Sequence, residues 1–170
     1  MMVKIETPNR PTAMDLRILV VDRQAHMTGI LVSLLRHLDF DDILVANSIK
    51  DACSLFLTNG PDLVICEEEL PDGSAISFCR KIRVKEDKDI DEMRSIGSVV
   101  GGYMIGPGDT PDGESFRSKF VLVTAHPTRT LVEQCKATGV DAIMTKPISQ
   151  RDLDMRLTHL FGGAIRKRAG

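Results

Sequence analysis

The chain has 170 residues, of which 42% are hydrophobic and 27% are charged, a composition typical of a globular protein with one complete core. Its net charge of −2 and its isoelectric point near 6.1 argue against a nucleic-acid-binding surface, which usually carries a basic patch. No apolar run approaches the roughly 20 residues that cross a bilayer, and the N-terminus lacks the apolar core of a signal peptide. We therefore expect a cytoplasmic protein that binds neither nucleic acid nor membranes.

Short β-branched runs alternate with amphipathic segments along the chain. The runs predict five buried strands, at 16–22, 42–46, 63–66, 120–123 and 142–144. Apolar residues spaced by three and four predict helices over 27–38, from Ser48 to Gly60, over 74–83, from about 131 to Gly139 and after Ser149. This alternation predicts an α/β fold: a doubly wound, five-stranded parallel sheet with helices on both faces. The predicted domain spans 16–161, between a flexible leader at 1–15 and a basic tail at 162–170.

A long insertion at 84–119 separates the third helix from the fourth strand. Connections of this kind usually take about 2–6 residues, and longer ones are usually functional or disordered. We expect a short helix near 90–96 and an extended piece at 99–105, which could form a hairpin with the start of the fourth strand. The insertion contains apolar residues that we expect to be exposed, and these predict a site of self-association or partner binding. The residues are Val99, Val100, Tyr103, Met104 and Ile105.

Polar side chains follow four of the predicted strands. Asp22 follows the first strand, Glu67 the third and Thr124 the fourth. Lys146 comes just after the fifth strand and directly before Pro147. Because the carboxyl ends of parallel strands share one edge of the sheet, we expect these side chains to meet in one pocket.

The segment from 61 to 73 and the pocket together resemble response-regulator receiver (CheY-like) domains of two-component signal transduction. The strings at 121–125 and 139–147 also match that family in spacing, and the likeness covers 16–161 apart from the insertion. The resemblance implies that acids after the first and third strands hold Mg²⁺. It also implies that the acid after the third strand takes a phosphoryl group from a histidine kinase. It also implies that Thr124 and Lys146 ligate the phosphoryl oxygens, and that an aromatic residue on the fifth strand acts as a switch.

Three positions depart from the pattern of the family. Glu67 stands in place of the phospho-accepting Asp, Arg23 in place of a second acid, and Ile143 in place of the aromatic residue. Because Arg23 and Lys146 balance the charges of Asp22 and Glu67, we expect no bound cofactor, and Mg²⁺ binding that is weak at best. The added C–C bond of Glu67 moves its oxygens by up to about 1.5 Å. A misplacement of about 1 Å can slow a reaction around a hundredfold, so we expect no catalytic residue and no enzyme.

Two questions about the pocket stay open at this level. Glu67 either reaches Lys146 and Thr124 and imitates a phosphorylated state, or joins an inert ion pair. The guanidinium of Arg23 either takes the place of the metal ion or points into solvent. We expect Ile143 to fill space, and Glu68 and Glu69 to belong to a partly solvated acidic loop.

The favoured interpretation is an atypical, pseudo-receiver domain of a phosphorelay that signals by binding proteins. The resemblance suggests a histidine kinase, a phosphotransfer protein or a downstream effector as partner, and a homodimer is also possible. It implies a docking surface at 128–161, and it implies that the first helix, at 27–38, is the surface that meets a histidine kinase. One alternative is a phospho-accepting response regulator that uses Glu67 with Mg²⁺, and another is a receiver fragment of a larger regulator. A flavodoxin-like module for small molecules would need a phosphate-binding loop after the first strand, which 23–26 does not supply.

Overall fold

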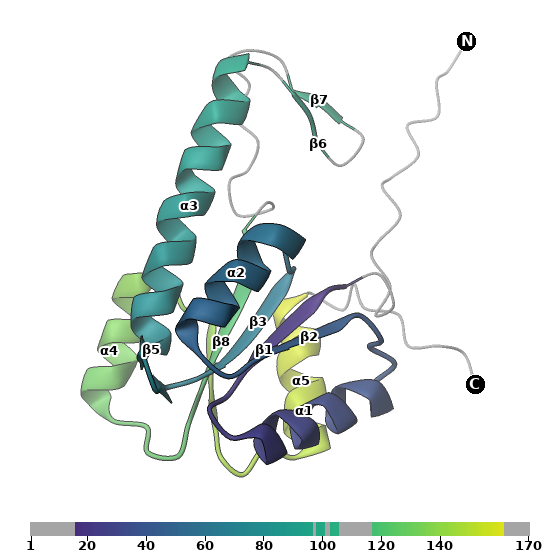
Figure 1. Cartoon of the computed structure of the whole chain (residues 1–170), viewed down its shortest axis with the longest axis vertical. Coiled ribbons are helices and arrows are strands. Elements are labelled where there is room, and N and C mark those ends of the chain that lie inside the picture. The colour runs from purple at the N-terminus through teal and green to yellow at the C-terminus, as the bar shows by residue number, and fades with distance from the viewer. Residues whose placement is uncertain (1–15, 97, 101–102, 106–116, 162–170) are drawn as a thin grey trace.

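One parallel five-stranded sheet forms the centre of the molecule (Figure 1). The computed structural model describes residues 16–96, 98–100, 103–105 and 117–161, and the predicted leader and tail lie outside these ranges. The strands of the sheet are β1 (Ile18–Val21), β2 (Ile43–Ala46), β3 (Leu63–Glu67), β8 (Lys119–Thr124) and β9 (Ala142–Thr145). Their order, β2-β1-β3-β8-β9, is that of a doubly wound, flavodoxin-like sheet, and it confirms the predicted fold class.

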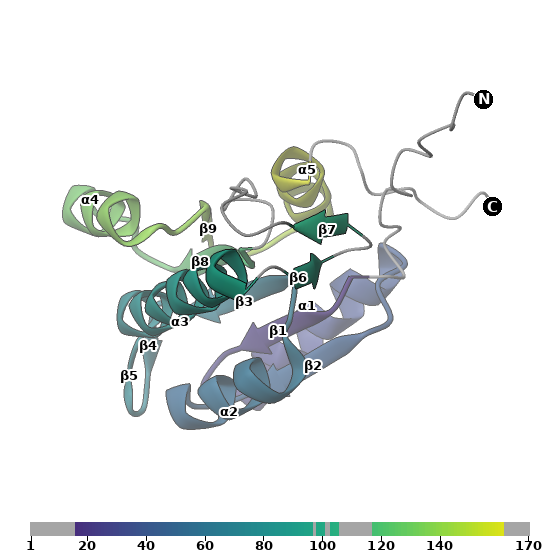
Figure 2. The same ribbon diagram turned by 90° about the horizontal axis from the view of Figure 1, so that it is seen from above.

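Helices cover both faces of this sheet (Figure 2). They are α1 (Ala25–His37), α2 (Ile49–Asn59), α3 (Ala75–Ile96), α4 (Arg129–Thr138) and α5 (Gln150–Leu160). Because side chains alternate along a strand, Ile18 and Val20 pack with α1 and α5, while Leu19 and Val21 pack with α2, α3 and α4. Both faces of the central strands are thus buried, which explains their unbroken apolar runs. None of the helices in the described part of the chain combines the length and apolar character that a membrane span requires.

Hydroxyl side chains and glycines set several helix ends. Ser48, Thr128 and Ser149 each accept a hydrogen bond from a backbone N–H in the first turn of α2, α4 and α5. Gly60 and Gly139 end α2 and α4 in the left-handed conformation, with φ of 54° and 85°. The predicted caps at Ser48 and Ser149 and the predicted helix ends at Gly60 and Gly139 are confirmed.

The acid Asp72 ties the loop after β3 to the start of α2. It lies between two short strands, β4 (Glu69–Leu70) and β5 (Gly73–Ser74), which pair antiparallel. Its carboxylate accepts the backbone N–H groups of Ile49 at 2.7 Å and Lys50 at 2.9 Å. These two hydrogen bonds lower the pKa of Asp72 below its ordinary value of 3.8.

Replacing Asp72 with alanine is expected to lower the melting temperature at neutral pH, because the first turn of α2 loses the acceptor of two N–H groups. A folded-state pKa below the unfolded one stabilises the protein above the unfolded pKa, and this stability is lost as the pH falls through the folded pKa. The difference between wild type and Asp72→Ala should therefore shrink in thermal melts below about pH 4. Asp41→Ala, at an exposed acid before β2, is the control and should change little at either pH.

The third helix differs from its prediction. α3 runs to Ile96, so the predicted end near Arg83 is wrong, and the predicted short helix at 90–96 is the last part of α3. The buried face continues from Ile82 through Glu86 to Ile90, at helical spacing. Because a charged residue, Glu86, occupies a buried position in the middle of this face, the apolar pattern of the sequence stops too early.

The extended piece of the insertion also pairs differently. β6 (Ser98–Val100) and β7 (Tyr103–Ile105) form an antiparallel pair with each other, not with the start of β8. The intervening sequence, Gly101-Gly102, is typical of a two-residue hairpin connection, and this signal was missed. The predicted binding role of the apolar side chains at 99–105 lies outside the described side chains.

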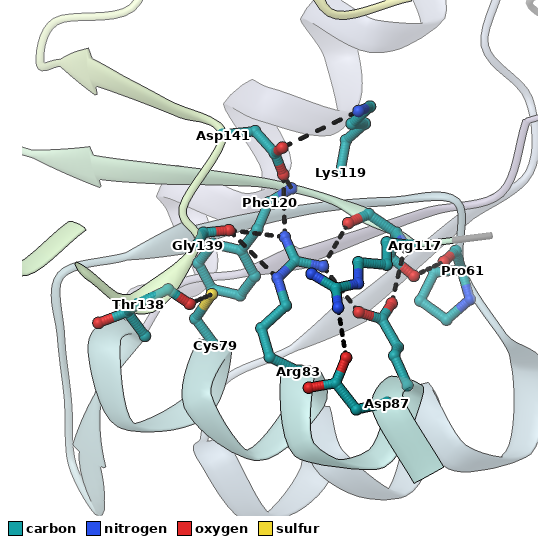
Figure 3. A network of polar contacts seen from close by, with 12 residues as sticks. Pro61, Cys79, Arg83, Asp87, Arg117, Lys119, Phe120, Thr138, Gly139 and Asp141 are labelled. Carbon is teal, nitrogen blue, oxygen red and sulfur yellow. Dashed lines mark hydrogen bonds and ion pairs between the residues drawn. The ribbon is translucent and has the colours of Figure 1, made fainter. Parts of the chain in front are cut away.

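An arginine with a mostly buried side chain fastens α3 to the start of β8 (Figure 3). The Arg83 side chain is 11% exposed, and its guanidinium pairs with Glu86 at 2.7 Å and Asp141 at 2.9 Å. It also donates to the backbone carbonyls of Ser118 and Gly139, and the shortest contact with each carbonyl is 2.8 Å. Glu86 in turn accepts the N–H of Ser118 at 2.8 Å. These contacts hold the chain on both sides of the β6–β7 segment at the amino ends of the strands, the edge opposite Glu67.

Candidate functional site

The carboxyl ends of the central strands bring the predicted pocket residues to one edge of the sheet. Asp22 directly follows β1, Glu67 is the last residue of β3, and Thr124 is the last residue of β8. These three residues are 1%, 8% and 2% exposed, so their polar atoms need partners inside the protein. Lys146 directly follows β9 and is the nearest cation.

Lys146 bridges the two buried acids. Its Nζ lies 2.9 Å from Oε1 of Glu67 and 3.2 Å from Oδ2 of Asp22. The other oxygen of Asp22 accepts the N–H of Gln24 at 2.9 Å, and the other oxygen of Glu67 accepts the N–H of Arg23 at 3.2 Å. All four carboxylate oxygens therefore have a donor supplied by the chain itself.

Arg23 lies next to Glu67 but remains half exposed. Its Nε is 3.7 Å from Oε2 of Glu67, and its side chain is 48% exposed. The guanidinium therefore adds positive charge beside Glu67 while it contacts solvent. An exposed pair of this length contributes little to stability, so the main anchor of Arg23 is its backbone N–H.

The protonation of the pocket follows from burial and from Lys146. Burial raises the pKa of Asp22 above 3.8, although the N–H of Gln24 opposes the rise. Burial opposes charge on Glu67 as well, but hydrogen bonds with Lys146 and Asp22 outweigh it and lower its pKa below 4.5. Burial also acts against the charge of Lys146, yet its bonds to Glu67 and Asp22 raise its pKa above 10.5. At neutral pH the pocket therefore holds a Lys146 cation beside an ionised Glu67.

Thr124 contacts a different acid from the one expected. Its hydroxyl donates to Oε2 of Glu68, not to Glu67, so the idea that Glu67 reaches Thr124 is corrected. Pairing of β3 with β8 places Glu67 opposite Val123, and the residues that follow these two, Glu68 and Thr124, then lie side by side. This register is the signal that could have identified Glu68, which the sequence placed in a partly solvated acidic loop.

Ile143 occupies the place of the predicted switch residue on β9. Its side chain is partly buried and packs against the core that contains α2, α3 and α4. A β-branched side chain has few rotamers, so it offers no second packing comparable to that of a swinging aromatic ring. The packing is compatible with the predicted space-filling role.

The pocket residues do not fit a tightly bound Mg²⁺ ion. Mg²⁺ requires near-octahedral oxygen ligands and usually relies on carboxylates. Here Lys146 lies against one oxygen of each acid, and Arg23 adds a second positive charge beside Glu67. Across the described residues, no three His, Cys, Asp or Glu side chains lie together in a way that could hold a metal ion.

Comparison with known proteins identifies the fold. No protein-family model and no curated protein matches the chain. Among solved structures, the chemotaxis response regulator CheY4 of Vibrio cholerae matches with 14% identity and a TM-score of 0.63, over 85% of this chain and 98% of that chain. A two-component response regulator from Clostridium difficile matches with 18% identity and a TM-score of 0.64, over 86% of this chain and 96% of that chain.

A third match is the receiver domain of the sensor histidine kinase PA1611 from Pseudomonas aeruginosa. It has 18% identity and a TM-score of 0.62, over 86% of this chain and 98% of that chain. That structure has a magnesium ion coordinated in its active site cleft. All three neighbours share their fold with this chain at low sequence identity.

Proposed function

We propose that this chain, which has the CheY-like receiver fold of two-component signalling proteins, is a pseudo-receiver that acts through protein–protein interaction. The observation that carries the proposal is the contact of Lys146 with both Glu67 and Asp22. Lys146 neutralises the acid that stands at the phospho-acceptor position, so the pocket is electrostatically complete without a phosphoryl group.

Phosphoryl transfer to Glu67 is disfavoured by placement and by charge. Transfer requires a nucleophile in line with phosphorus and cations that neutralise the developing charge. Both oxygens of Glu67 already accept hydrogen bonds, from Lys146 and from the N–H of Arg23. The positive charge beside Glu67 also reduces the attraction for Mg²⁺. The usual mechanism of phosphorylation is therefore lost in this proposal.

The proposal favours imitation of the phosphorylated state over an inert ion pair. By family resemblance, the lysine at the position of Lys146 grips a phosphoryl oxygen. In this chain Oε1 of Glu67 lies 2.9 Å from Lys146 Nζ and supplies an anionic oxygen to that lysine. Lys146 would thus be held permanently in the contact that phosphorylation creates elsewhere.

The partners we propose are proteins of a two-component system in the cytoplasm. A phosphotransfer protein or a downstream effector would bind the surface at 128–161, which contains α4, β9 and α5. A histidine kinase would bind α1, by family resemblance. In this proposal the chain has no enzymatic activity of its own and no resident cofactor.

Treatment with acetyl phosphate and Mg²⁺ tests the proposal. We expect the intact mass of the wild type to stay unchanged, because Glu67 and the cations around it block in-line transfer. The double variant Arg23→Asp/Glu67→Asp restores the acids that the family resemblance implies, and we expect it to gain the mass of one phosphoryl group. Glu69→Asp, at an exposed acid two residues away, is the control and should gain none. An acid-labile phosphoryl group on Glu67 of the wild type would show that the working phospho-receiver is correct.

A further inference from the structure

We infer that Glu68 is a second built-in anion of this pocket, which holds the hydroxyl of Thr124 and thereby positions the loop between β8 and α4. The inference rests on the proposed function, since it concerns how carboxylates that permanently occupy the pocket affect the conformation of the docking surface. Glu68 is a positioning residue in this account, because it acts through Thr124.

The first element of the inference is the contact itself. Thr124 is 2% exposed, and its Oγ1 donates to Oε2 of Glu68 at 2.5 Å. The same Oγ1 accepts the backbone N–H of His126 at 3.1 Å. If Glu68 is removed, the buried O–H of Thr124 is left without an acceptor, which is unfavourable, so Glu68 determines how the Thr124 hydroxyl points.

The second element is that the backbone of Glu68 is fixed on both sides. Its N–H donates to the carbonyl of Val123 at 2.8 Å, and its carbonyl accepts the N–H of Ala75, the first residue of α3, at 2.9 Å. The carboxylate therefore projects from a segment that β8 and α3 both hold, and its position relative to Thr124 is well defined.

The third element is a division of contacts between two adjacent acids. Lys146 binds Glu67, and Thr124 binds Glu68. By family resemblance these two donors grip the oxygens of one phosphoryl group. In this chain a carboxylate already occupies each of them, and an added anion would have to displace both against their negative charge.

The fourth element is the short connection from Thr124 to α4. His126 is tied to Thr124, and Thr128 caps α4 by accepting the N–H of Leu131 at 3.1 Å. The loop is thus anchored at both ends within a few residues. A change at Glu68 should therefore be felt at the start of α4, where the proposed docking surface begins.

The experiment compares Glu68→Ala, Glu68→Gln and Glu69→Gln by NMR in the intact chain. In Glu68→Ala we expect the His126 amide and Thr124 methyl signals to shift. Hydrogen exchange at the His126 amide should accelerate at least about tenfold, because the hydroxyl that accepts this amide loses its own hydrogen bond to a charged acceptor. Glu68→Gln keeps an acceptor oxygen and should restore both signals. Glu69→Gln is the matched control at the neighbouring exposed acid and should leave them unchanged.

Thr124→Val removes the hydroxyl from the other side and covers the case in which Glu68→Ala does not fold. It should shift the His126 amide as Glu68→Ala does, and the double variant should add little further change. The inference is wrong if Glu68→Ala or Thr124→Val leaves the His126 amide where Glu69→Gln leaves it. Failure of the proposed function has a separate signature, a phosphoryl group on Glu67 of the wild type, which does not depend on the His126 signals.

Discussion

Replacing Arg83 with methionine is expected to lower the free energy of unfolding by about 3–5 kcal/mol, the range for breaking one side of a buried ion pair. The Glu86 side chain is only 9% exposed and would keep its charge without its guanidinium partner. The carbonyls of Ser118 and Gly139 would each lose a hydrogen-bond donor as well. Because small domains are stable by only about 5–15 kcal/mol, this loss is a large share of the total.

Urea denaturation measures this effect, with Arg80→Met as the control. Arg80 is exposed on the same helix, so its replacement should change the free energy of unfolding by no more than about 0.5 kcal/mol. The double variant Arg83→Met/Glu86→Leu should recover part of the loss, because removing both charges leaves neither of them buried alone. A loss below about 1 kcal/mol in Arg83→Met would mean that the network of Figure 3 is not a principal anchor of α3.

The same network explains where the sequence was informative and where it was not. Strands such as β1 are apolar on both faces, so their pattern needs no tertiary information. Hydroxyl caps and glycine ends are local signals, and Ser48 and Gly60 predicted the limits of α2. The length of α3 depends on Arg83 and Glu86 finding buried partners from distant segments, and hydropathy carries no record of such pairs.

In the candidate site, too, the sequence predicted which residues come together but not which of them form hydrogen bonds with each other. Parallel pairing places the ends of β1, β3 and β8 at one edge, which is why Asp22, Glu67 and Thr124 could be grouped from sequence. The partner of each donor depends on side-chain geometry and on register. Any of the three consecutive acids at 67–69 could accept the Thr124 hydroxyl as far as the sequence shows, and the pairing of β3 with β8 places Glu68 beside it.

The two polar clusters lie at opposite ends of the strands and have different consequences. The first cluster, around Arg83, connects α3 to the start of β8. Arg83 contacts Glu86 on the same helix and the carbonyl of Ser118, and Glu86 accepts the N–H of Ser118. The second cluster lies at the carboxyl ends of the strands, where Asp22 and Glu67 share Lys146 and the neighbouring Glu68 accepts the hydroxyl of Thr124. Stability should therefore respond to both clusters, whereas exchange at the β8–α4 loop should respond to the second.

Replacing Lys146 with methionine should destabilise the chain by about 3 kcal/mol at neutral pH, the lower end of the buried-pair range because the lysine is 19% exposed. Asp22 and Glu67 would keep their burial but lose their shared cation, so the pKa of each should rise. An acid whose folded pKa is raised destabilises the protein progressively as the pH rises from its unfolded pKa. The difference between wild type and Lys146→Met should accordingly shrink as the pH falls toward about 4, in urea denaturation at several pH values.

Two further variants sharpen this test. Lys136→Met, at an exposed lysine in the last turn of α4, should show neither the loss nor its pH dependence. Lys146→Met/Glu67→Gln removes one of the two stranded charges and should regain part of the stability at neutral pH, because Asp22 alone is then left without a cation. On the alkaline side, the raised pKa of Lys146 keeps its stabilisation in place up to its ordinary value of 10.5, and this stabilisation is lost only as the pH passes the folded pKa. Equal stability of wild type and Lys146→Met at neutral pH would mean that the lysine does not neutralise Glu67, and the contact on which the proposed pseudo-receiver function rests would then be absent.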